Sequence, residues 1–239
     1  MASLERIRVV LVHPRHPGNI GAAARAMKNM GLRHLVLVAP SSFDLTQAAA
    51  MAVHASDVLD GRCEAASLAE AVAGCGLVVG TCGRPAAALA RGSAPRALAP
   101  EIVAACATND VALVFGPEDH GLSNNDLALC QRVISIPASP VYDSLNLAQA
   151  VLVCAYEVLL AASRPPPPSS RTLATSERLE LMYASLEPAL RAIGFLHRDN
   201  AEHMMRTLRL IFARAALDDR EVQVLLGISR QIAWAASRA

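Results

Sequence analysis

The sequence predicts an α/β domain with a doubly wound parallel sheet, followed by a small all-α extension. Short apolar runs rich in β-branched residues alternate with longer helical patterns, a proline-rich segment then interrupts the chain, and three amphipathic patterns follow it. Strands that alternate with helices in this way form parallel sheets covered by helices on both faces. At 239 residues the chain is long enough for such a domain and one smaller unit.

Five segments are expected to form the buried strands of the sheet. Each is short, apolar and bounded by residues that favour turns, which distinguishes it from the longer helical patterns. The expected strands are Ile7–Val12, His34–Ala39, Leu77–Thr81, Val111–Gly116 and Val133–Pro137.

Helix boundaries are signalled near both ends of this domain. Residues 17–19 precede an Ala-rich run and Gly31 follows it. We therefore expect a helix over Ile20–Met30, with Asn19 in the N-cap position and Gly31 as a left-handed terminal residue. The last helix of the domain is expected to begin near Ser144, which is a candidate cap, and to end near Ala162.

Four consecutive prolines separate the two parts of the chain. Prolines cannot continue a helix and favour an extended spacer, so residues 164–171 are predicted as a linker between a domain at 1–163 and an extension at 172–239. Amphipathic patterns in the extension predict helices over Thr172–Ala192, Asp199–Ala216 and Asp218–Ala236, capped by Thr175 or Ser176, by Asp199 and by Asp218.

Composition excludes disordered and membrane-spanning classes of protein. With 53% hydrophobic and 18% charged residues, the chain is too apolar for disorder. Its longest apolar stretch, Ala148–Ala162, contains Gln149 and Glu157 and is too short to cross a bilayer. Residues 1–8 lack the features of a secretory signal, so a cytoplasmic location is expected.

Cysteines and charge give weaker indications. The six cysteines form no Cys-x-x-Cys pair and no Cys/His spacing suited to zinc, so we interpret them as small buried residues and expect no metal. The formal net charge of +1 gives no global argument for nucleic-acid binding. Residues 1–40, however, carry six Arg or Lys against one acid, which suits a phosphate-bearing partner at that end.

Four loops follow the expected strands and are candidates to line one cleft. Ligands of open parallel sheets bind beyond the carboxyl ends of the strands. The loops are residues 13–21 (HPRHPGNIG), 81–83 (TCG), 116–121 (GPEDHG) and 137–146 (PASPVYDSLN). None contains Gly-x-Gly-x-x-Gly or Gly-x-x-x-x-Gly-Lys-Ser/Thr, which disfavours nicotinamide oxidoreductases and P-loop nucleotidases.

Three ordered motifs in these loops carry a family resemblance. They are Asn19–Arg25 (NIGAAAR), Phe115–Glu118 (FGPE) with Gly121-Leu122, and Ile136-Pro137 with Ser144–Ala148 (SLNLA). Together they resemble the SPOUT superfamily of TrmH-like RNA 2′-O-methyltransferases. The proline-rich linker and helical tail are similar to those of its TrmJ branch, which methylates the ribose of tRNA nucleotide 32, a cytidine or uridine in the anticodon loop.

The resemblance implies features that residue periodicity does not show. It implies a trefoil knot near the carboxyl end of the first domain, S-adenosyl-L-methionine as methyl donor, no metal, and a homodimer whose second subunit completes the RNA site. The extension is implied to bind tRNA or to support the dimer. By matching motif positions, the residues around the cofactor would be Thr81, Cys82, Gly83, Gly116, Ile136, Asp143, Ser144 and Leu145. Glycines let a backbone approach a ligand closely, and Ile136 and Leu145 would form an apolar slot for adenine.

Arg25, Ser144 and Asn19 are implied to act on the RNA. We expect Arg25 to bind a neighbouring phosphate and to stabilise the developing alkoxide, because a guanidinium does not lose its proton in a protein. The proton of the 2′-hydroxyl would pass to Ser144, to water or to a phosphate oxygen. Asn19 would contact the substrate, although an N-cap role alone also explains it.

Other polar residues in the loops have simpler interpretations. Glu118 is expected to orient its loop, together with Asp119, rather than to act as an acid or base. His13 and His16 have no partner ligand close in sequence, and Cys82 has no nearby base, so neither a metal site nor a nucleophile is favoured.

Three rival functions are weighed against this interpretation. Residues Val222–Ala233 (VQVLLGISRQIA) have the pattern of a DNA-binding helix-turn-helix, although packing of a small helical unit produces the same pattern and is favoured. The same chemistry on another tRNA position or on ribosomal RNA is one alternative. A non-catalytic nucleic-acid-binding protein is another, and the presence of Arg25, Gly116 and Ser144 disfavours it.

Overall fold

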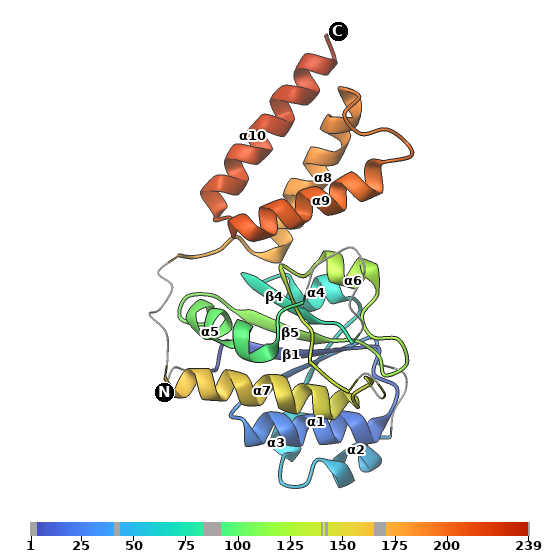
Figure 1. Cartoon of the computed structure of the whole chain (residues 1–239), viewed down its shortest axis with the longest axis vertical. Coiled ribbons are helices and arrows are strands. Elements are labelled where there is room, and N and C mark those ends of the chain that lie inside the picture. Colours follow the sequence, from blue (N-terminus) through green and yellow to red (C-terminus); the bar gives the residue numbers. More distant parts are fainter. Residues whose placement is uncertain are drawn as a thin grey trace.

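The computed structural model describes residues 4–40, 44–83, 92–139, 141, 143–164 and 171–238. An α/β domain carries the helical extension on one side (Figure 1). Six strands form one sheet in the order β3-β2-β1-β5-β4-β6, and every neighbouring pair is parallel. The predicted parallel α/β fold is therefore confirmed. The trefoil knot stays a prediction.

The strands follow the apolar runs of the sequence closely. They are β1 (Ile7–Val12), β2 (His34–Val38), β3 (Cys63–Ala65), β4 (Leu77–Thr81), β5 (Val111–Phe115) and β6 (Arg132–Ile134). Both β1 and β4 have the predicted bounds, whereas β2 and β5 end one residue early. The prediction for β6 extended too far, because residues 135–137 leave the sheet and enter a loop. The edge strand β3 was not predicted, since its three residues are largely exposed and form no apolar run.

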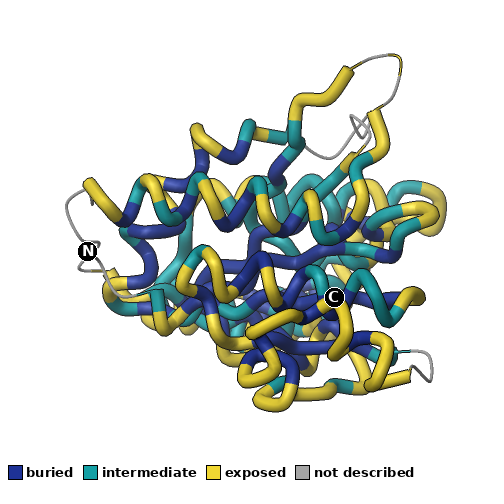
Figure 2. The backbone as a smooth tube through the Cα atoms, turned by 90° about the horizontal axis from the view of Figure 1, so that it is seen from below, coloured by how far each residue is buried: buried dark blue, intermediate teal, exposed yellow. Residues whose placement is uncertain are grey.

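The sheet has a separate apolar cluster on each face because side chains alternate along a strand. Ile7, Val9 and Leu11 of β1 point to one face, and Val10 and Val12 to the other. The first face is covered by α1 (Pro17–Asn29), α2 (Leu45–Met51), α3 (Ser56–Asp60), α5 (Pro95–Ala105) and α7 (Leu147–Ser163), and the second by α4 (Leu68–Val72) and α6 (Asn124–Ala128). Figure 2 shows the buried trace concentrated inside these layers. Each fully buried Val, Ile or Leu contributes about 1.5–3 kcal/mol.

Helix α1 begins earlier than expected. Its N-cap is His16, with no side-chain cap, and Pro17 occupies the first turn, where its missing N–H costs nothing. The prediction that Asn19 is the N-cap was wrong, because Asn19 lies inside the first turn of the helix and its side chain bonds to another loop. Gly31 has a φ of +76°, as predicted for the residue that ends the helix.

Helix α7 begins at Leu147, so the predicted start near Ser144 and a cap role for Ser144 were wrong. Asn146 is the N-cap, and its side chain and that of Gln149 form a capping box. An amide at the N-cap with Gln at N3 satisfies two backbone N–H groups of the first turn, which fixes the start of the helix here.

The extension consists of α8 (Ser176–Ala192), α9 (Ala201–Ala215) and α10 (Asp219–Ala236) around a small core of its own. Thr175 caps α8 and Asp218 caps α10, as predicted. Asp199 does not cap α9, since Asn200 precedes the helix and makes no side-chain cap bond. The helix-turn-helix alternative was wrong, because α10 is one unbroken helix. Residues 165–170 of the predicted linker lie outside the described residues.

The extension attaches at the amino ends of three strands. Ahead of β4, Ser176 N donates to Cys75 O over 2.9 Å, and ahead of β5, Leu173 N donates to Asn109 Oδ1 over 2.8 Å. Arg132, the first residue of β6, donates to a backbone carbonyl of α9 over 2.8 Å. Since the strands are parallel, all three attachments lie at one edge of the sheet, opposite its carboxyl ends.

Three of the six cysteines are buried as predicted, while Cys82 and Cys130 are half-buried and one is exposed. Cys75, Cys106 and Cys154 are buried, and burial raises the pKa of Cys75 to about 11 and that of Cys154 to about 12. Cys63 is exposed on β3, so the prediction was wrong there. Within the described residues, no helix has the length and apolar character needed to cross a membrane.

Candidate active site

A cavity of about 300 Å³ lies at the carboxyl edge of the sheet. The ends of β4 and β5, the loops after β5 and β6, α6 and the start of α7 form its walls. All of the predicted cofactor residues line it: Thr81, Cys82, Gly83, Gly116, Ile136, Asp143, Ser144 and Leu145. The structure thus brings together residues that lie up to 64 positions apart in the sequence, from Thr81 to Leu145. Their role toward a cofactor stays a prediction.

Close packing fixes the turn after β5. A Cβ atom on Gly116 would lie 2.2 Å from the carbonyl carbon of Gly121 and 2.2 Å from the amide nitrogen of Leu122. No side chain fits there, so glycine is required for the loop to fold back on itself. Gly121 has a φ of +71°, a left-handed conformation that also favours glycine. These two glycines shape one wall of the cavity.

Glu118 holds the loop after β1 against the loop after β5. Its carboxylate accepts hydrogen bonds from Arg15 N (3.2 Å), His16 N (3.3 Å) and Asn19 Nδ2 (2.8 Å). Partial burial by itself would raise the pKa of Glu118, but the hydrogen bonds from Asn19 and the backbone outweigh it and lower the pKa. The carboxylate therefore stays charged at neutral pH, in agreement with its interpretation as a residue that orients loops.

Asn19 extends this arrangement to the third motif. Asn146 Nδ2 donates to Asn19 Oδ1 over 2.9 Å, while Asn146 Oδ1 accepts from Ala148 N over 2.9 Å and caps α7. One polar chain from Glu118 through Asn19 to Asn146 therefore joins three loops of the site. No role for Asn146 was predicted, although an Asn followed three residues later by Gln149 ahead of an apolar helical run signals a capping box.

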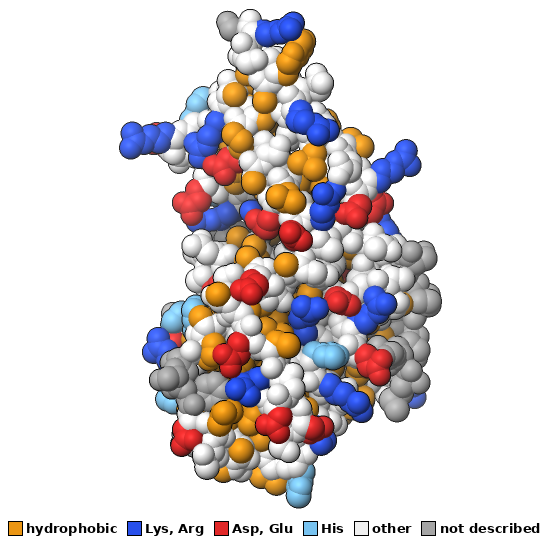
Figure 3. Space-filling model, turned by 180° about the vertical axis from the view of Figure 1, so that it is seen from behind, with side chains coloured by type: hydrophobic (Ala, Val, Ile, Leu, Met, Phe, Trp, Pro, Cys, Tyr) orange, Lys and Arg blue, Asp and Glu red, His pale blue; other side chains and the backbone are white. Residues whose placement is uncertain are grey.

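Arg25 lies apart from the cavity. It is exposed on α1 and is not among the residues that line the cavity. The basic face expected for residues 1–40 is largely neutralised, because Arg6 and Arg8 pair with Asp110, Arg15 with Asp119 and Lys28 with Asp57. Among the described residues, Arg25 and Arg33 form no ion pair. Figure 3 shows the same mixture of acidic and basic side chains over the back of the molecule.

The histidines near the site do not converge on a metal. His13 has a left-handed φ of +46°, and its ring nitrogen Nδ1 lies 3.2 Å from Ala39 O. His120 pairs with Asp119 over 2.6 Å at the rim of the cavity. In the described parts of the chain, no group of three or more His, Cys, Asp or Glu residues could hold a metal ion.

The sheet and its cavity are those of a known class of protein. The model of the SpoU rRNA methylase family matches residues 6–156, and that of the C-terminal domain of the tRNA methyltransferase TrmJ matches residues 177–239. These matches define the class as RNA methyltransferases of the SpoU type.

Individual relatives narrow the class further. The tRNA (cytidine/uridine/adenosine-2′-O-)-methyltransferase TrmJ of Pseudomonas aeruginosa (strain UCBPP-PA14) is 44% identical, over 94% of this chain and 93% of its own. The tRNA (cytidine/uridine-2′-O-)-methyltransferase TrmJ of Escherichia coli (strain K12) is 41% identical over 96% of both chains. The crystal structure of TrmJ from Z. mobilis ZM4 superposes with a TM-score of 0.81 at 32% identity, covering 96% of this chain and 99% of that one. The chain belongs to the TrmJ family of RNA 2′-O-methyltransferases.

Proposed function

We propose that the chain transfers a methyl group from S-adenosyl-L-methionine to the ribose 2′-hydroxyl of nucleotide 32 in the tRNA anticodon loop. The observation that carries this proposal is the cavity at the carboxyl edge, which gathers residues of the second and third methyltransferase motifs. The first motif does not line the cavity and is joined to the other two through Asn19. The names of the relatives support tRNA as the substrate and the 2′-oxygen as the methylated atom. A cytoplasmic location fits a substrate of this kind.

The cavity suits the proposed cofactor. Its volume of about 300 Å³ falls at the lower end of small-ligand sites, which measure roughly 300–1,000 Å³. Ile136 and Leu145 supply apolar walls, and no described residue has an atom within 4 Å of the position of a Cβ on Gly83. Asp143 brings a carboxylate to a site proposed for a positively charged ligand. When bound, S-adenosylmethionine supplies a methyl group that its sulfonium already activates.

The chain must then align the acceptor and assist its deprotonation. We assign Arg25 to a phosphate of the RNA and to the developing alkoxide, because a guanidinium keeps its proton and stabilises negative charge. Ser144 lines the cavity with an exposed side chain, so its hydroxyl, water or a phosphate oxygen takes the proton of the 2′-hydroxyl. Asn19 acts as a substrate contact or holds the loops through its bonds to Glu118 and Asn146.

A homodimer explains why Arg25 lies outside the cavity of its own chain. Leu152, Tyr156 and Leu160 are 39–46% exposed and follow one another at four-residue intervals on α7, which packs beside α1. An apolar stripe of this kind favours self-association. A second subunit docked here would cover the stripe and complete the RNA site near Arg25. Light scattering tests this proposal, and a stable, active monomer would refute it.

The domain organisation that the family resemblance implies is part of the same proposal. They are a catalytic domain at residues 1–163 with a trefoil knot near its carboxyl end, a linker at 164–171 and a tRNA-binding extension at 172–239. The extension attaches opposite the cavity of its own chain. A tRNA that contacts an extension and a cavity together would therefore cross the sheet or use the extension of the second subunit.

The alternatives concern the RNA that is modified. The name of the Escherichia coli relative includes cytidine and uridine, and that of the Pseudomonas aeruginosa relative also includes adenosine. Transcripts with cytidine, uridine or adenosine at nucleotide 32 are therefore tested. The family model is named for ribosomal RNA, which makes ribosomal RNA the second candidate substrate.

Methyl transfer from labelled S-adenosylmethionine to unmodified tRNA transcripts tests the proposal, with the product mapped by mass spectrometry. We expect a 2′-O-methyl group at nucleotide 32 and a loss of about a hundred-fold or more in Arg25→Ala. Arg33→Ala is the matched control, because Arg33 is a second exposed arginine without an ion pair among the described residues, and it should retain activity. Full turnover in Arg25→Lys would refute the role given to Arg25. If methyl groups were transferred to ribosomal RNA alone, ribosomal RNA would replace tRNA as the proposed substrate. If the chain bound the cofactor but methylated neither RNA, it would be a non-catalytic binding protein.

A further inference from the structure

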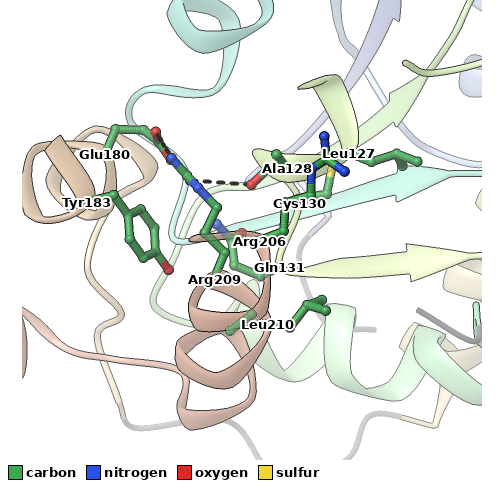
Figure 4. A pocket seen from close by; sticks show the side chains of 10 residues that line it. Leu127, Ala128, Cys130, Gln131, Glu180, Tyr183, Arg206, Arg209 and Leu210 are labelled. Carbon is green, nitrogen blue, oxygen red and sulfur yellow. Dashed lines mark hydrogen bonds and ion pairs between the residues drawn. The ribbon is translucent and has the colours of Figure 1, made fainter. Parts of the chain in front are cut away.

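Arg209 of α9 forms the centre of a joint between the extension and the α/β domain (Figure 4). Its guanidinium carbon lies 4.1 Å from the centroid of the Tyr183 ring. Both of its terminal nitrogens pair with the carboxylate of Glu180, with Nη2 at 2.7 Å from Oε2. Nη1 also donates to Ala128 O over 3.5 Å. A residue of the extension thus contacts the last residue of α6.

Helix α6 connects this joint to the cavity at the other edge of the sheet. The chain leaves β5 at the carboxyl edge, passes through α6 and enters β6 at the amino edge. Asn124 lines the large cavity, Ala128 lines a small cavity of about 20 Å³ at the joint, and Leu127 lines both. The position of Leu127 therefore affects both cavities.

Strand β4 packs closely against α6 and the residues that flank it. The Cβ position of Gly80 is already occupied, with Cys130 Sγ at 2.7 Å, Leu122 Cδ1 at 3.1 Å and Leu127 Cδ2 at 3.3 Å. Gly80 directly precedes Thr81, a residue of the large cavity. A shift of α6 would therefore be transmitted to the cavity wall, because close-packed side chains move together.

A second arginine attaches α9 to the same segment. Arg132 Nη1 donates to Ala213 O over 2.8 Å, and its Nε pairs with Glu101 over 2.9 Å. The segment from α6 to β6 is therefore attached to α9 at Ala128 and at Arg132, and it continues to Ile136 in the large cavity. This segment connects the loop after β5 to the loop after β6, and both loops carry predicted cofactor residues. Between the two loops, the segment contacts the extension.

We infer that Arg209 is a positioning residue for methyl transfer. By holding α6 against α9, Arg209 keeps the cavity wall in the shape that binds the cofactor, and it couples that shape to RNA bound by the extension. This inference rests on the proposed function for the identity of the cofactor and of the RNA. A merely structural role would lower the stability of the fold without changing cofactor affinity or its response to tRNA.

Calorimetric titration of the full-length protein with S-adenosylhomocysteine, with and without tRNA transcript, tests the inference. In Arg209→Ala we expect cofactor binding to weaken by about three- to ten-fold and to respond less to tRNA than in the native chain. Arg206→Ala is the matched control, because Arg206 lines the same small cavity but pairs with Glu202 on its own helix. It should bind cofactor as the native chain does.

Thermal unfolding of each variant identifies any that fail to fold. If Arg209→Ala does not fold, Arg209→Lys replaces it, because a lysine keeps the charge beside Glu180 but has one terminal nitrogen in place of the planar fork that holds Glu180 and Ala128 O together. The same weakening of cofactor binding is then expected. Native affinity and native tRNA response in a folded Arg209 variant would overturn the inference alone. A native chain that binds no S-adenosylhomocysteine would overturn the proposed function, and the inference with it.

Discussion

The two edges of the sheet are built differently. At the amino edge, the carbonyl oxygen of Cys75 and the side chain of Asn109 accept hydrogen bonds from the extension. Polar groups just ahead of β4 and β5 therefore have partners within the chain. At the carboxyl edge, a cavity remains, and His13 and Ala39, directly after β1 and β2, adopt left-handed backbone conformations. Strained residues of this type concentrate at functional sites. The comparison indicates that changes at the carboxyl edge should mainly affect activity, and that changes at the amino edge, apart from the Arg209 joint, should mainly affect stability.

The largest effect is expected for Gly116→Ala at the carboxyl edge. The added Cβ would meet backbone atoms of Gly121 and Leu122 at 2.2 Å, so the turn must shift. A displacement of about 1 Å in a site can cost roughly a hundred-fold in rate, and we expect a loss of that size in methyl transfer. Steady-state assays with S-adenosylmethionine and tRNA measure it.

Gly74→Ala provides the matched control at the amino edge. Among the residues that the structure describes, nothing lies within 4 Å of its Cβ position, and the residue lies just ahead of β4. It should retain turnover within about twofold, because surface substitutions away from special features change stability by less than about 0.5 kcal/mol. Equal losses in the two variants would contradict the proposed difference between the edges.

Asn109→Ala should have the largest effect at the amino edge. Asn109 is 5% exposed, and its side chain donates to Arg171 O (3.2 Å) and accepts from Leu173 N (2.8 Å). Leaving such groups unsatisfied costs about 1–3 kcal/mol, so the free energy of unfolding should fall by about 2 kcal/mol. Chemical denaturation measures this change. A large loss of turnover with unchanged stability would show that Asn109 acts in methyl transfer, and it would contradict the proposed difference between the two edges.

Local patterns predicted much of the fold, and the family resemblance supplied the predicted cofactor residues that line the cavity. The expectation that the loop at residues 13–21 lines the same cleft was wrong. The bounds of β1 and β4 follow from runs of β-branched residues, and the carboxyl-edge rule brings Thr81, Gly116 and Ser144 to one place. Edge strand β3 could not be predicted, because its three residues have no distinguishing pattern.

Contacts between distant residues were the part that sequence reasoning could not supply. Asn19 bonds to residues 99 and 127 positions away, and nothing near it in the sequence indicates either partner. The contacts between the extension and the α/β domain could not be predicted either. Arg209 and Arg132 donate to backbone carbonyls, and since every residue has one, the sequence does not indicate the acceptor. Motifs therefore identified the residues of two loops that line the cavity, whereas the structure was needed to show how the loops are held and where Arg25 lies.

Glu118→Gln should have a smaller effect at the carboxyl edge. The neutral amide accepts the three N–H groups less well than a carboxylate, and we expect turnover at neutral pH to fall by about ten-fold. The folded-state pKa of Glu118 lies below its ordinary value of 4.5. Its stabilising contribution is therefore complete above that ordinary value and is lost as the pH falls through the lowered one.

The pH dependence tests whether the charge of Glu118 holds the loops together. Denaturation of native chain and Glu118→Gln between about pH 6 and pH 3 should show a stability difference that shrinks with falling pH. Asp57→Asn is the control, because Asp57 pairs with Lys28 at an exposed site outside the cavity. It should change turnover little. A stability difference for Glu118→Gln that does not vary with pH would show that the carboxylate charge is not what holds the loops.

The smallest effect, and one of opposite sign, is expected for Gly227→Ala in the extension. Gly227 lies within α10, its Cβ position has no atom within 4 Å, and its φ is not among the positive values. Alanine is favoured over glycine inside a helix by about 0.5–1 kcal/mol, so the variant should be more stable by up to that amount. Thermal unfolding and tRNA binding measure the outcome. A Gly227→Ala variant less stable than the native chain would contradict this expectation, and the contrast with Gly116 would disappear.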